Sequence, residues 1–209
     1  MAHLVSVNVG EPRDVEWFGR TVRTAIWKAP VDGPVPVRGE NLAGDAQADL
    51  RVHGGPDKAV YAYAAEDLAW WAGQGEDVGP GTFGENLTTE GVEVSGAVLG
   101  EHWRVGTALF EVAQPREPCF KLGIRMGRAS FKDDFAAAER PGAYLRIVEE
   151  GEVTAGDPVE VLDRPDHGLT VLGLLRASEA ADPESLRRVL ATGAAPAGWQ
   201  AWAERRLSG

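Results

Sequence analysis

Glycine and proline interrupt the apolar segments of this chain at short intervals. Its 209 residues include 26 glycines and 13 prolines, and most of them precede residue 165. Glycine reaches the positive φ angles of tight turns, while proline fixes φ and removes a backbone donor, so both are rare inside long helices and central strands. The first part of the chain is therefore restricted to short elements joined by turns, which is typical of a strand-rich fold.

The segments between these turns are predicted to be strands, because they alternate with polar residues or are rich in β-branched and aromatic residues. The predicted strands cover residues 4–9, 21–27, 59–63, 102–105, 109–113, 144–148 and 159–162. Within residues 98–114 and 151–163, a turn containing glycine separates two short strands, as in the hairpins of small barrels. No fixed repeat length is present, which excludes propellers and solenoids. We predict a mainly β fold with helices, of the α+β class.

Helical periodicity appears in two segments of this first part. Residues 64–75 place apolar side chains on one helical face, and residues 119–140 show a similar pattern that Gly127 is expected to divide into two helices.

Three short helices are predicted after residue 165. Asp182 precedes Pro183, a combination that marks a helix start, and Gly193 marks a break. Helices of this length are not stable alone, so they must pack on one another or on the strands. We predict a β-barrel domain over residues 1–165 and a three-helix region over residues 166–209.

The charge balance limits the partners of the chain. A net charge of −11 argues against a broad basic face for nucleic acid or for an anionic membrane surface, so neither partner is expected. No apolar run approaches the roughly 20 residues of a transmembrane helix. The first ten residues do not resemble a secretory signal. We expect a cytoplasmic protein with no membrane span.

The segment AQPREPCFKLG, residues 113–123, contains the only cysteine of the chain, Cys119. Residues 116–128 carry four cations against one acid, namely Arg116, Lys121, Arg125 and Arg128 against Glu117. Nearby cations favour the thiolate, and a helix that starts at Cys119 would add to this effect. The pattern is compatible with a reactive thiolate in a basic pocket and, equally, with a small buried thiol at a strand–helix junction.

Two further segments carry candidate functional residues. Lys28 ends a predicted strand, and His53 precedes Gly54 and Gly55 in a tight loop whose amides can approach a ligand. Taken singly, such a lysine is usually a solvated charge and such a histidine a hydrogen-bonding group of the loop. Residues 79–84, GPGTFG, match a dinucleotide fingerprint, but no strand precedes them and no helix follows, so we interpret them as a loop. One cysteine and four scattered histidines give no closed zinc site.

Taken together, these segments resemble a known family. The order GDAQADLRVHGGPDKAVYAY, FGENLTTEG, QPREPCFKL and RRLSG is similar to the MOSC domain family and, within it, to the YiiM-like subfamily, over nearly the whole chain. The resemblance implies a MOSC-type β-barrel with a cleft, followed by a small three-helix region. It also implies the molybdenum cofactor (molybdopterin), a pterin with a dithiolene-bound metal and a phosphate. YiiM-like members are associated with detoxification of N-hydroxylated base analogues such as 6-N-hydroxylaminopurine.

The resemblance assigns a metal-binding role to the thiol. The family's single cysteine matches Cys119, and in related amidoxime-reducing MOSC enzymes the corresponding thiolate is thought to ligate molybdenum. Molybdenum accepts such a soft ligand when the sulfur is deprotonated. Arg116, Lys121 and Arg125 would then lower the pKa of the thiol and bind the phosphate of the cofactor.

The remaining candidates complete the implied site. Gly54 and Gly55 would let the backbone approach the flat pterin, and Asn86 would pair with its amide-like edge. Lys28 or His53 would supply the proton that the departing hydroxide needs. The substrate would be a small N-hydroxylated molecule reduced to its amine, with electrons from a separate reductase, since no flavin, haem or iron–sulfur motif is visible.

Three alternatives remain open at this point. Cys119 could carry sulfane sulfur as a persulfide for transfer, or the protein could bind and deliver the cofactor without turnover. An inert scaffold with a buried thiol is the third. Trp17 and Trp70 are candidates for a homodimer face, although seven tryptophans can equally fill a core.

Overall fold

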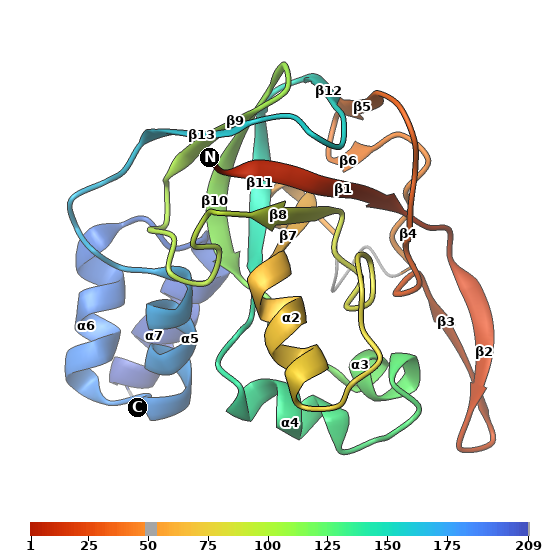
Figure 1. The fold of residues 1–209 in the computed structure, drawn as a ribbon. Coiled ribbons are helices and arrows are strands. Elements are labelled where there is room, and N and C mark those ends of the chain that lie inside the picture. Colours follow the sequence, from red (N-terminus) through yellow and green to blue (C-terminus); the bar gives the residue numbers. More distant parts are fainter. Residues whose placement is uncertain (49–53, 209) are drawn as a thin grey trace.

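The computed structural model describes residues 1–48 and 54–208, and His53 therefore lies outside the described residues. Within them the chain forms an α+β fold that combines a large mixed sheet with six α-helices (Figure 1). The predicted class is confirmed. None of the described helices has the length and apolar character needed to cross a membrane.

Eight strands form the large sheet. In their order across the sheet they are β13 (Val159–Asp163), β9 (His102–Val105), β10 (Ala108–Pro115), β11 (Ala143–Glu149), β7 (Val60–Ala64), β8 (Leu87–Glu90), β1 (His3–Val9) and β4 (Ala29–Pro30). All neighbours are antiparallel except β7 and β8, which are parallel and are joined through a helix. This crossover brings the loop before β8 to the same end of the sheet as the start of β7.

Two smaller sheets lie beside the large one. The first contains β12 (Gly151–Val153), β5 (Val35–Arg38) and β6 (Asn41–Leu42). The second is a hairpin of β2 (Arg13–Trp17) and β3 (Arg20–Thr24), which extends away from the body at the lower right of Figure 1. The predicted strand over 21–27 is therefore shorter than expected, because the chain leaves the hairpin after Thr24.

The predicted β-barrel is not closed. The edge strands β13 and β4 do not pair with each other, and β4 is too short to bridge the gap. Instead the start of β1 meets the turn before β13 through an isolated bridge of His3 and Pro158. Three backbone bonds support it, from Leu4 N to Asp157 O (2.8 Å), from Gly156 N to Leu4 O (2.7 Å) and from Val159 N to Ala2 O (3.0 Å). The sheet is thus strongly curled and held at its seam by a turn instead of a strand pair.

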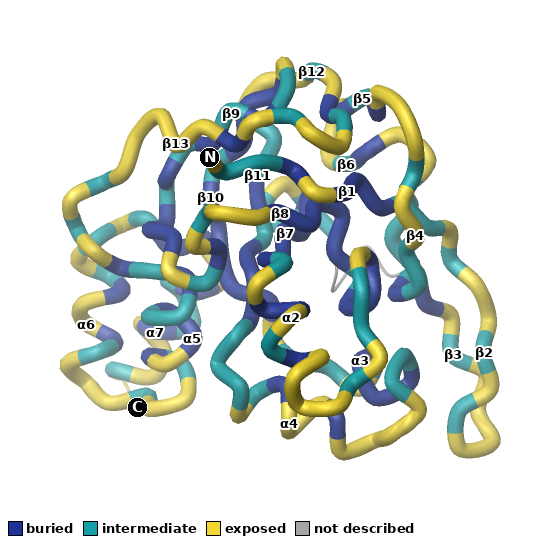
Figure 2. Tube along the Cα trace, in the orientation of Figure 1, coloured by how far each residue is buried: buried dark blue, intermediate teal, exposed yellow. Residues whose placement is uncertain are grey.

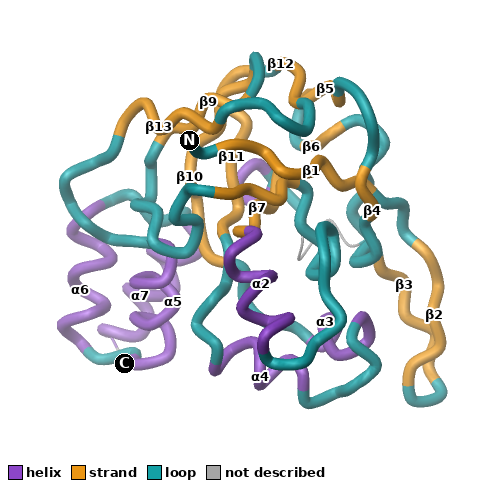
Figure 3. Tube along the Cα trace, in the orientation of Figure 1, coloured by secondary structure: helices purple, strands orange, loops and turns teal. Residues whose placement is uncertain are grey.

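The helices form two groups, which Figure 3 shows in purple below the sheet. They are α2 (Ala65–Gly73), α3 (Phe120–Arg125) and α4 (Phe131–Ala137) in one group, and α5 (Val171–Ala180), α6 (Pro183–Thr192) and α7 (Ala197–Ser208) in the other. A short 3₁₀ helix, η1 (Pro56–Lys58), precedes β7. Gly127, at φ 68°, follows α3 and breaks the predicted helical segment. The Asp182 side chain accepts from the N–H groups of Glu184 and Ser185 (both 3.0 Å), which confirms it as the cap of α6.

Two hydrophobic clusters hold these layers together, and Figure 2 shows them as the dark, buried inner segments. The larger one joins the sheet to the C-terminal helices, because Leu174, Val189 and Trp199 pack in the same cluster as Phe110 of β10. The region after residue 165 therefore packs directly on the sheet.

The smaller cluster is aromatic and fixes α2, α3 and α4 against β7. Phe135 is 1% exposed and stacks on Trp71 with ring centroids 5.9 Å apart. It also meets Phe83 edge-on at 5.2 Å. Because Phe83 belongs to the loop before β8 and α3 follows Cys119, this cluster determines how that loop and the thiol approach each other.

Replacing Phe135 by Ala is expected to lower the free energy of unfolding by about 3–5 kcal/mol, the cost of a cavity in a packed core. Phe18→Ala is the matched control, since Phe18 is 81% exposed and its loss is expected to change stability by less than about 0.5 kcal/mol. Urea unfolding at a single pH measures both. Equal destabilisation by the two variants would show that the aromatic cluster does not organise this side of the fold.

Candidate functional site

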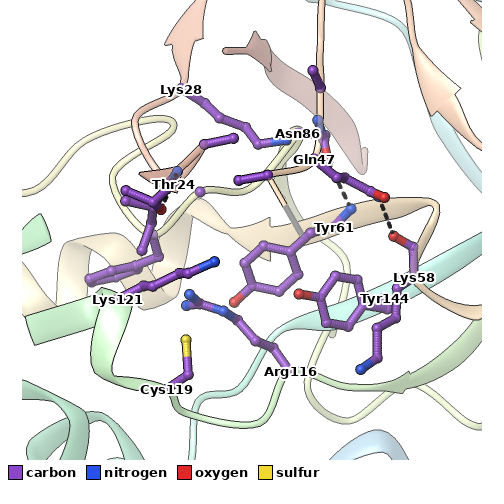
Figure 4. A pocket seen from close by; sticks show the side chains of 16 residues that line it. Thr24, Lys28, Gln47, Lys58, Tyr61, Asn86, Arg116, Cys119, Lys121 and Tyr144 are labelled. Carbon is purple, nitrogen blue, oxygen red and sulfur yellow. Dashed lines mark hydrogen bonds between the residues drawn. The ribbon is translucent and has the colours of Figure 1, made fainter. Parts of the chain in front are cut away.

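A pocket opens where the end of the β2–β3 hairpin, η1, the loop before β8 and the start of α3 meet (Figure 4). Its cavity volume is about 90 Å³. We call it the thiol pocket, because Cys119 lies in its wall. Its other polar lining residues include Lys28, Lys58, Asn86, Arg116, Lys121 and Tyr144. The structure thus brings together four cations and the single thiol, although they come from distant parts of the chain.

Cys119 is the residue immediately before α3. Its backbone is extended, its carbonyl accepts from Leu122 N (3.0 Å), and its thiol is free and half-buried. The predicted helix boundary at this residue is confirmed. Cys119 is partly exposed and lines the pocket, so it is not a fully buried thiol.

Arg116 is the most deeply buried cation of the pocket, at 6% exposure. Burial works against its charge, but the phenol of Tyr61 and the thiol of Cys119 act in the opposite direction and leave the pKa of Arg116 above its ordinary value. Within the described part of the chain, its Nη1 atom is buried without a hydrogen-bond partner. A buried donor of this kind is costly unless a ligand satisfies it.

Two tyrosines flank Arg116, as Figure 4 shows. The guanidinium lies 5.3 Å from the ring centroid of Tyr61, whose hydroxyl donates to Pro141 O (2.7 Å). Burial raises the pKa of both Tyr61 and Tyr144, so both phenols stay protonated near neutral pH. They give the pocket an uncharged, hydrogen-bonding wall beside its cations.

Lys28 lies opposite and forms a buried ion pair. Its Nζ is 2.5 Å from Asp45 Oδ2, and the two side chains are 9% and 1% exposed. Burial lowers the pKa of Lys28, and the charge of Asp45 opposes that shift without cancelling it. Asp45 also accepts from Gly10 N (2.9 Å) and Asn86 Nδ2 (3.0 Å). The lysine is thus held in place by a carboxylate that is itself fully bonded.

Asn86 lines the pocket, and its amide is bonded within the protein. Its Oδ1 accepts from Tyr61 N (3.1 Å), and its Nδ2 donates to Asp45 and, at 3.3 Å, to Asn8 O. These bonds join β7 and β8 to the ion pair of Lys28. The amide therefore positions Asp45, in addition to any contact that it makes with a ligand.

The glycine-rich loop 79–84 is a series of turns with no helix after it, which confirms its interpretation as a loop. Its amides bind an internal carboxylate: Gly81 N and Phe83 N donate to Glu85 at 2.6 and 3.0 Å. Gly81 has φ +82°, and a Cβ atom there would lie 2.5 Å from Lys28 O. The glycine is therefore required for the loop to pack on the backbone beside Lys28.

Other predicted residues lie elsewhere. Arg125 does not line the thiol pocket, because it is one helical turn, roughly 5.4 Å, further along α3 than Lys121. Arg128 instead pairs with Glu76 (2.7 Å) and Asp134 (2.9 Å). Gly54 and Gly55 line a second, larger cavity.

Sequence reasoning missed Asp45, Lys58, Tyr61 and Tyr144. Asp45, Lys58 and Tyr61 stand inside the quoted motif segment, residues 44–63, so a signal existed for these three. Tyr144 is recognisable only once β7 pairs with β11 and brings it to the pocket.

A curled mixed sheet, helices packed on it and a basic pocket around one thiol define a class of small α+β domain. The MOSC domain family model matches residues 49–160, more than half of the chain, and this chain belongs to the MOSC domain family.

Within that family the chain is YiiM-like. Protein YiiM of Escherichia coli (strain K12) is 32% identical over 193 residues, which cover 89% of this chain and 86% of that protein. The crystal structure of YiiM from Geobacillus stearothermophilus superimposes with a TM-score of 0.81 at 30% identity, over 99% of this chain and 100% of that one.

Two further relatives differ in how they are named. The uncharacterized protein YflK of Bacillus subtilis (strain 168) is 35% identical over 201 residues, 95% of this chain and 91% of that protein. A protein of Gibberella moniliformis named "Reductase" is 31% identical over 170 residues, which cover 78% of this chain but 30% of that longer protein.

Glu85 predicts a specific pH dependence of stability. Burial raises its pKa from 4.5 to about 7, although backbone N–H bonds oppose the shift. Below pH 4.5 both folded and unfolded states hold the proton, and the stabilising contribution is fully present. As the pH rises to 7, the unfolded state loses the proton first, so the free energy of unfolding falls by up to about 3 kcal/mol.

Urea unfolding of Glu85→Gln at pH 5, 6, 7 and 8 is expected to show a shallower decline than the wild type. Glu160→Gln, which changes an exposed carboxyl on β13, is the control and is expected to keep the wild-type slope. Parallel curves for the wild type and Glu85→Gln would contradict the assignment.

The cations of the thiol pocket predict anion binding. Inorganic phosphate is expected to bind the purified protein and, in Lys121→Ala, to bind about tenfold or more weakly, because one charge-assisted hydrogen bond is lost. Lys132→Ala removes an exposed lysine of α4 and is expected to bind as the wild type does. Isothermal titration calorimetry measures all three, and equal affinities would show that the pocket is not an anion site.

Proposed function

We propose that this protein is a molybdenum-cofactor-dependent reductase of N-hydroxylated compounds, with purine hydroxylamines such as 6-N-hydroxylaminopurine as its substrate class. The observation that carries this proposal is the thiol pocket itself. It joins an accessible thiol, Cys119, to a buried guanidinium, Arg116, whose Nη1 lacks a hydrogen-bond partner among the described residues. The relative named "Reductase" supports a redox role.

The residues present fit the polar groups of the cofactor. The unsatisfied Nη1 of Arg116, with Lys121 beside it and Lys28 on the opposite side of the same pocket (Figure 4), suits a phosphate. The thiol of Cys119 suits a soft metal ion. A volume of about 90 Å³ is smaller than the roughly 300–1,000 Å³ of most ligand sites, so the pocket accounts for these polar groups and not for the whole ring system.

When bound, the cofactor supplies a two-electron redox centre that the protein side chains lack. The reaction breaks the N–O bond of the substrate: R–NHOH, two electrons and two protons give R–NH₂ and water. A separate reductase provides the electrons. Cys119 would hold the metal, and the phenols of Tyr61 and Tyr144 would orient polar groups of the ligands.

Lys28 is proposed as the proton donor for the departing hydroxide. Its lowered pKa makes the ammonium a stronger acid than an ordinary lysine, and Asp45 fixes its position at the pocket wall. His53, outside the described residues, remains the other predicted donor. Measuring reduction by the Lys28→Met and Lys28→Arg variants across pH would decide between these two donors. Arginine keeps the positive charge but does not give up its proton, so Lys28→Arg loses activity only if Lys28 is the donor.

The decisive experiment is expression of the full chain with cofactor supply, followed by measurement of molybdenum content and of 6-N-hydroxylaminopurine reduction with an artificial electron donor. We expect the wild type to carry the metal and turn over. Cys119→Ala is expected to lose at least about 10–100-fold in metal affinity or activity, because mutating a group that only hydrogen-bonds to a metal ligand already causes a loss of that size. Lys132→Ala serves as the folded control.

Other outcomes discriminate between the alternatives. Equal molybdenum content in the wild type and Cys119→Ala would overturn the ligand assignment. Metal-loaded protein that reduces no N-hydroxylated compound with any donor would indicate a binding or delivery module. Sulfane sulfur on Cys119 without bound pterin would indicate a sulfur carrier.

A further inference from the structure

A second cavity lies between the sheet and the C-terminal helices, and most of its lining residues do not belong to the thiol pocket. Its volume is about 530 Å³, within the roughly 300–1,000 Å³ typical of small-molecule sites. We call it the tryptophan cavity. Residues 54–58, the end of β10 and one face of α7 form its walls, and Lys58 belongs to both this cavity and the thiol pocket. A ligand in the second cavity therefore borders the first.

The walls of the tryptophan cavity are joined by hydrogen bonds. Trp199 Nε1 of α7 donates to Gln114 Oε1 of β10 (2.7 Å), and Gln114 Nε2 donates to Asp57 O of η1 (3.0 Å). One buried side chain thus connects all three walls. A cavity whose walls are fixed in this way needs little reorganisation to bind a rigid ligand.

The lining of this cavity is aromatic and of mixed charge. Trp199, Trp202 and Arg206 lie at positions i, i+3 and i+7 of α7, so they share one face of the helix. The two indole rings meet edge-on with centroids 6.0 Å apart. Glu117 lies in the same lining, two residues before Cys119.

This chemistry differs from that of the thiol pocket, where the cations predominate. An aromatic surface with both donors and acceptors suits a flat, uncharged nitrogen heterocycle, which stacks on indole and uses its ring nitrogens and amino group for hydrogen bonds. Two sources fit this description, the purine ring of the substrate and the pterin ring of the cofactor. The two acidic residues of the cavity, Asp57 and Glu117, balance its two basic ones, Lys58 and Arg206, so the cavity favours the neutral purine over a cofactor that carries a phosphate.

We propose that the tryptophan cavity holds the heterocyclic ring of the N-hydroxylated substrate, with Trp202 as the stacking surface and Glu117 as acceptor for its N–H groups. This assignment rests on the proposed function, because it takes that substrate class as given. It adds a location for the ring and names residues that determine specificity without touching the metal.

The test is a calorimetric titration of cofactor-free, full-length protein with adenine, the amine product, and with 6-hydroxymethylpterin. Adenine is expected to bind the wild type, and Trp202→Ala is expected to weaken it by about 5–150-fold, the range for one base stacked on an aromatic side chain. Trp17→Ala, in the hairpin, is the control and is expected to bind adenine as the wild type does.

A second variant covers the case in which Trp202→Ala does not fold. Gly198 lines the cavity, and a Cβ atom there meets no atom within 4 Å, so Gly198→Phe adds bulk at the cavity wall without removing a contact. It is expected to weaken adenine binding at least tenfold. Gly73→Phe, at the end of α2, is the matched control, because its Cβ also meets no atom within 4 Å and it lies outside the cavity.

The outcomes separate this inference from the proposed function. Adenine binding that depends on Gly198 and Trp202 supports the inference even if the loaded protein shows no reductase activity. Failure of the wild type to bind adenine, or equal binding by Gly198→Phe, overturns it even if reduction occurs. Pterin binding that depends on these residues while adenine does not bind also overturns it and assigns the cavity to the cofactor ring.

Discussion

The site is built around one buried ion pair, between Lys28 and Asp45. Neither side chain has more than a small exposed fraction, and removing one partner from such a pair typically costs about 3–5 kcal/mol, because the other charge stays buried and unpaired. Gly10 and Asn86 complete the bonding of the carboxylate. The pair therefore joins the end of β1, the entry to β4 and the start of β8, and these are the segments that surround the pocket.

The distribution of charges over the molecule explains how an acidic protein contains a positively charged pocket. Several arginines away from it are close to a carboxylate, including Arg104, Arg128, Arg140, Arg146, Arg164 and Arg176. Arg116 instead faces phenols and a thiol, and its Nη1 has no hydrogen-bond partner among the described residues. A net charge of −11 is thus compatible with local attraction for an anion, because the described lining of the thiol pocket contains no carboxylate and the carboxylate paired with Lys28, on Asp45, is buried.

Much of the fold follows from local sequence patterns, and the site follows only in part. The strand over 102–105 and the cap at Asp182 were predictable because alternation and capping act over a few residues. β8, with the sequence LTTE, was missed because Thr88 and Thr89 are polar yet fully buried, and only their pairing with β1 explains this. Cys119, Arg116 and Lys121 were singled out from the cations around the lone thiol and Lys28 through the family resemblance, and all four line one pocket. The partner of Lys28, the tyrosines beside Arg116 and the position of Arg125 required the tertiary arrangement.

Because the sheet and the C-terminal helices share one hydrophobic cluster, the core of the sheet is completed only after those helices have been synthesised. Trp199 of α7 closes the cluster that contains Phe110 and bonds to Gln114 of β10. A nascent chain that has emerged from the ribosome only as far as β13 therefore keeps part of its apolar sheet surface uncovered. Synthesis at roughly 5–20 residues per second leaves this apolar surface exposed for a few seconds, during which a chaperone can bind it.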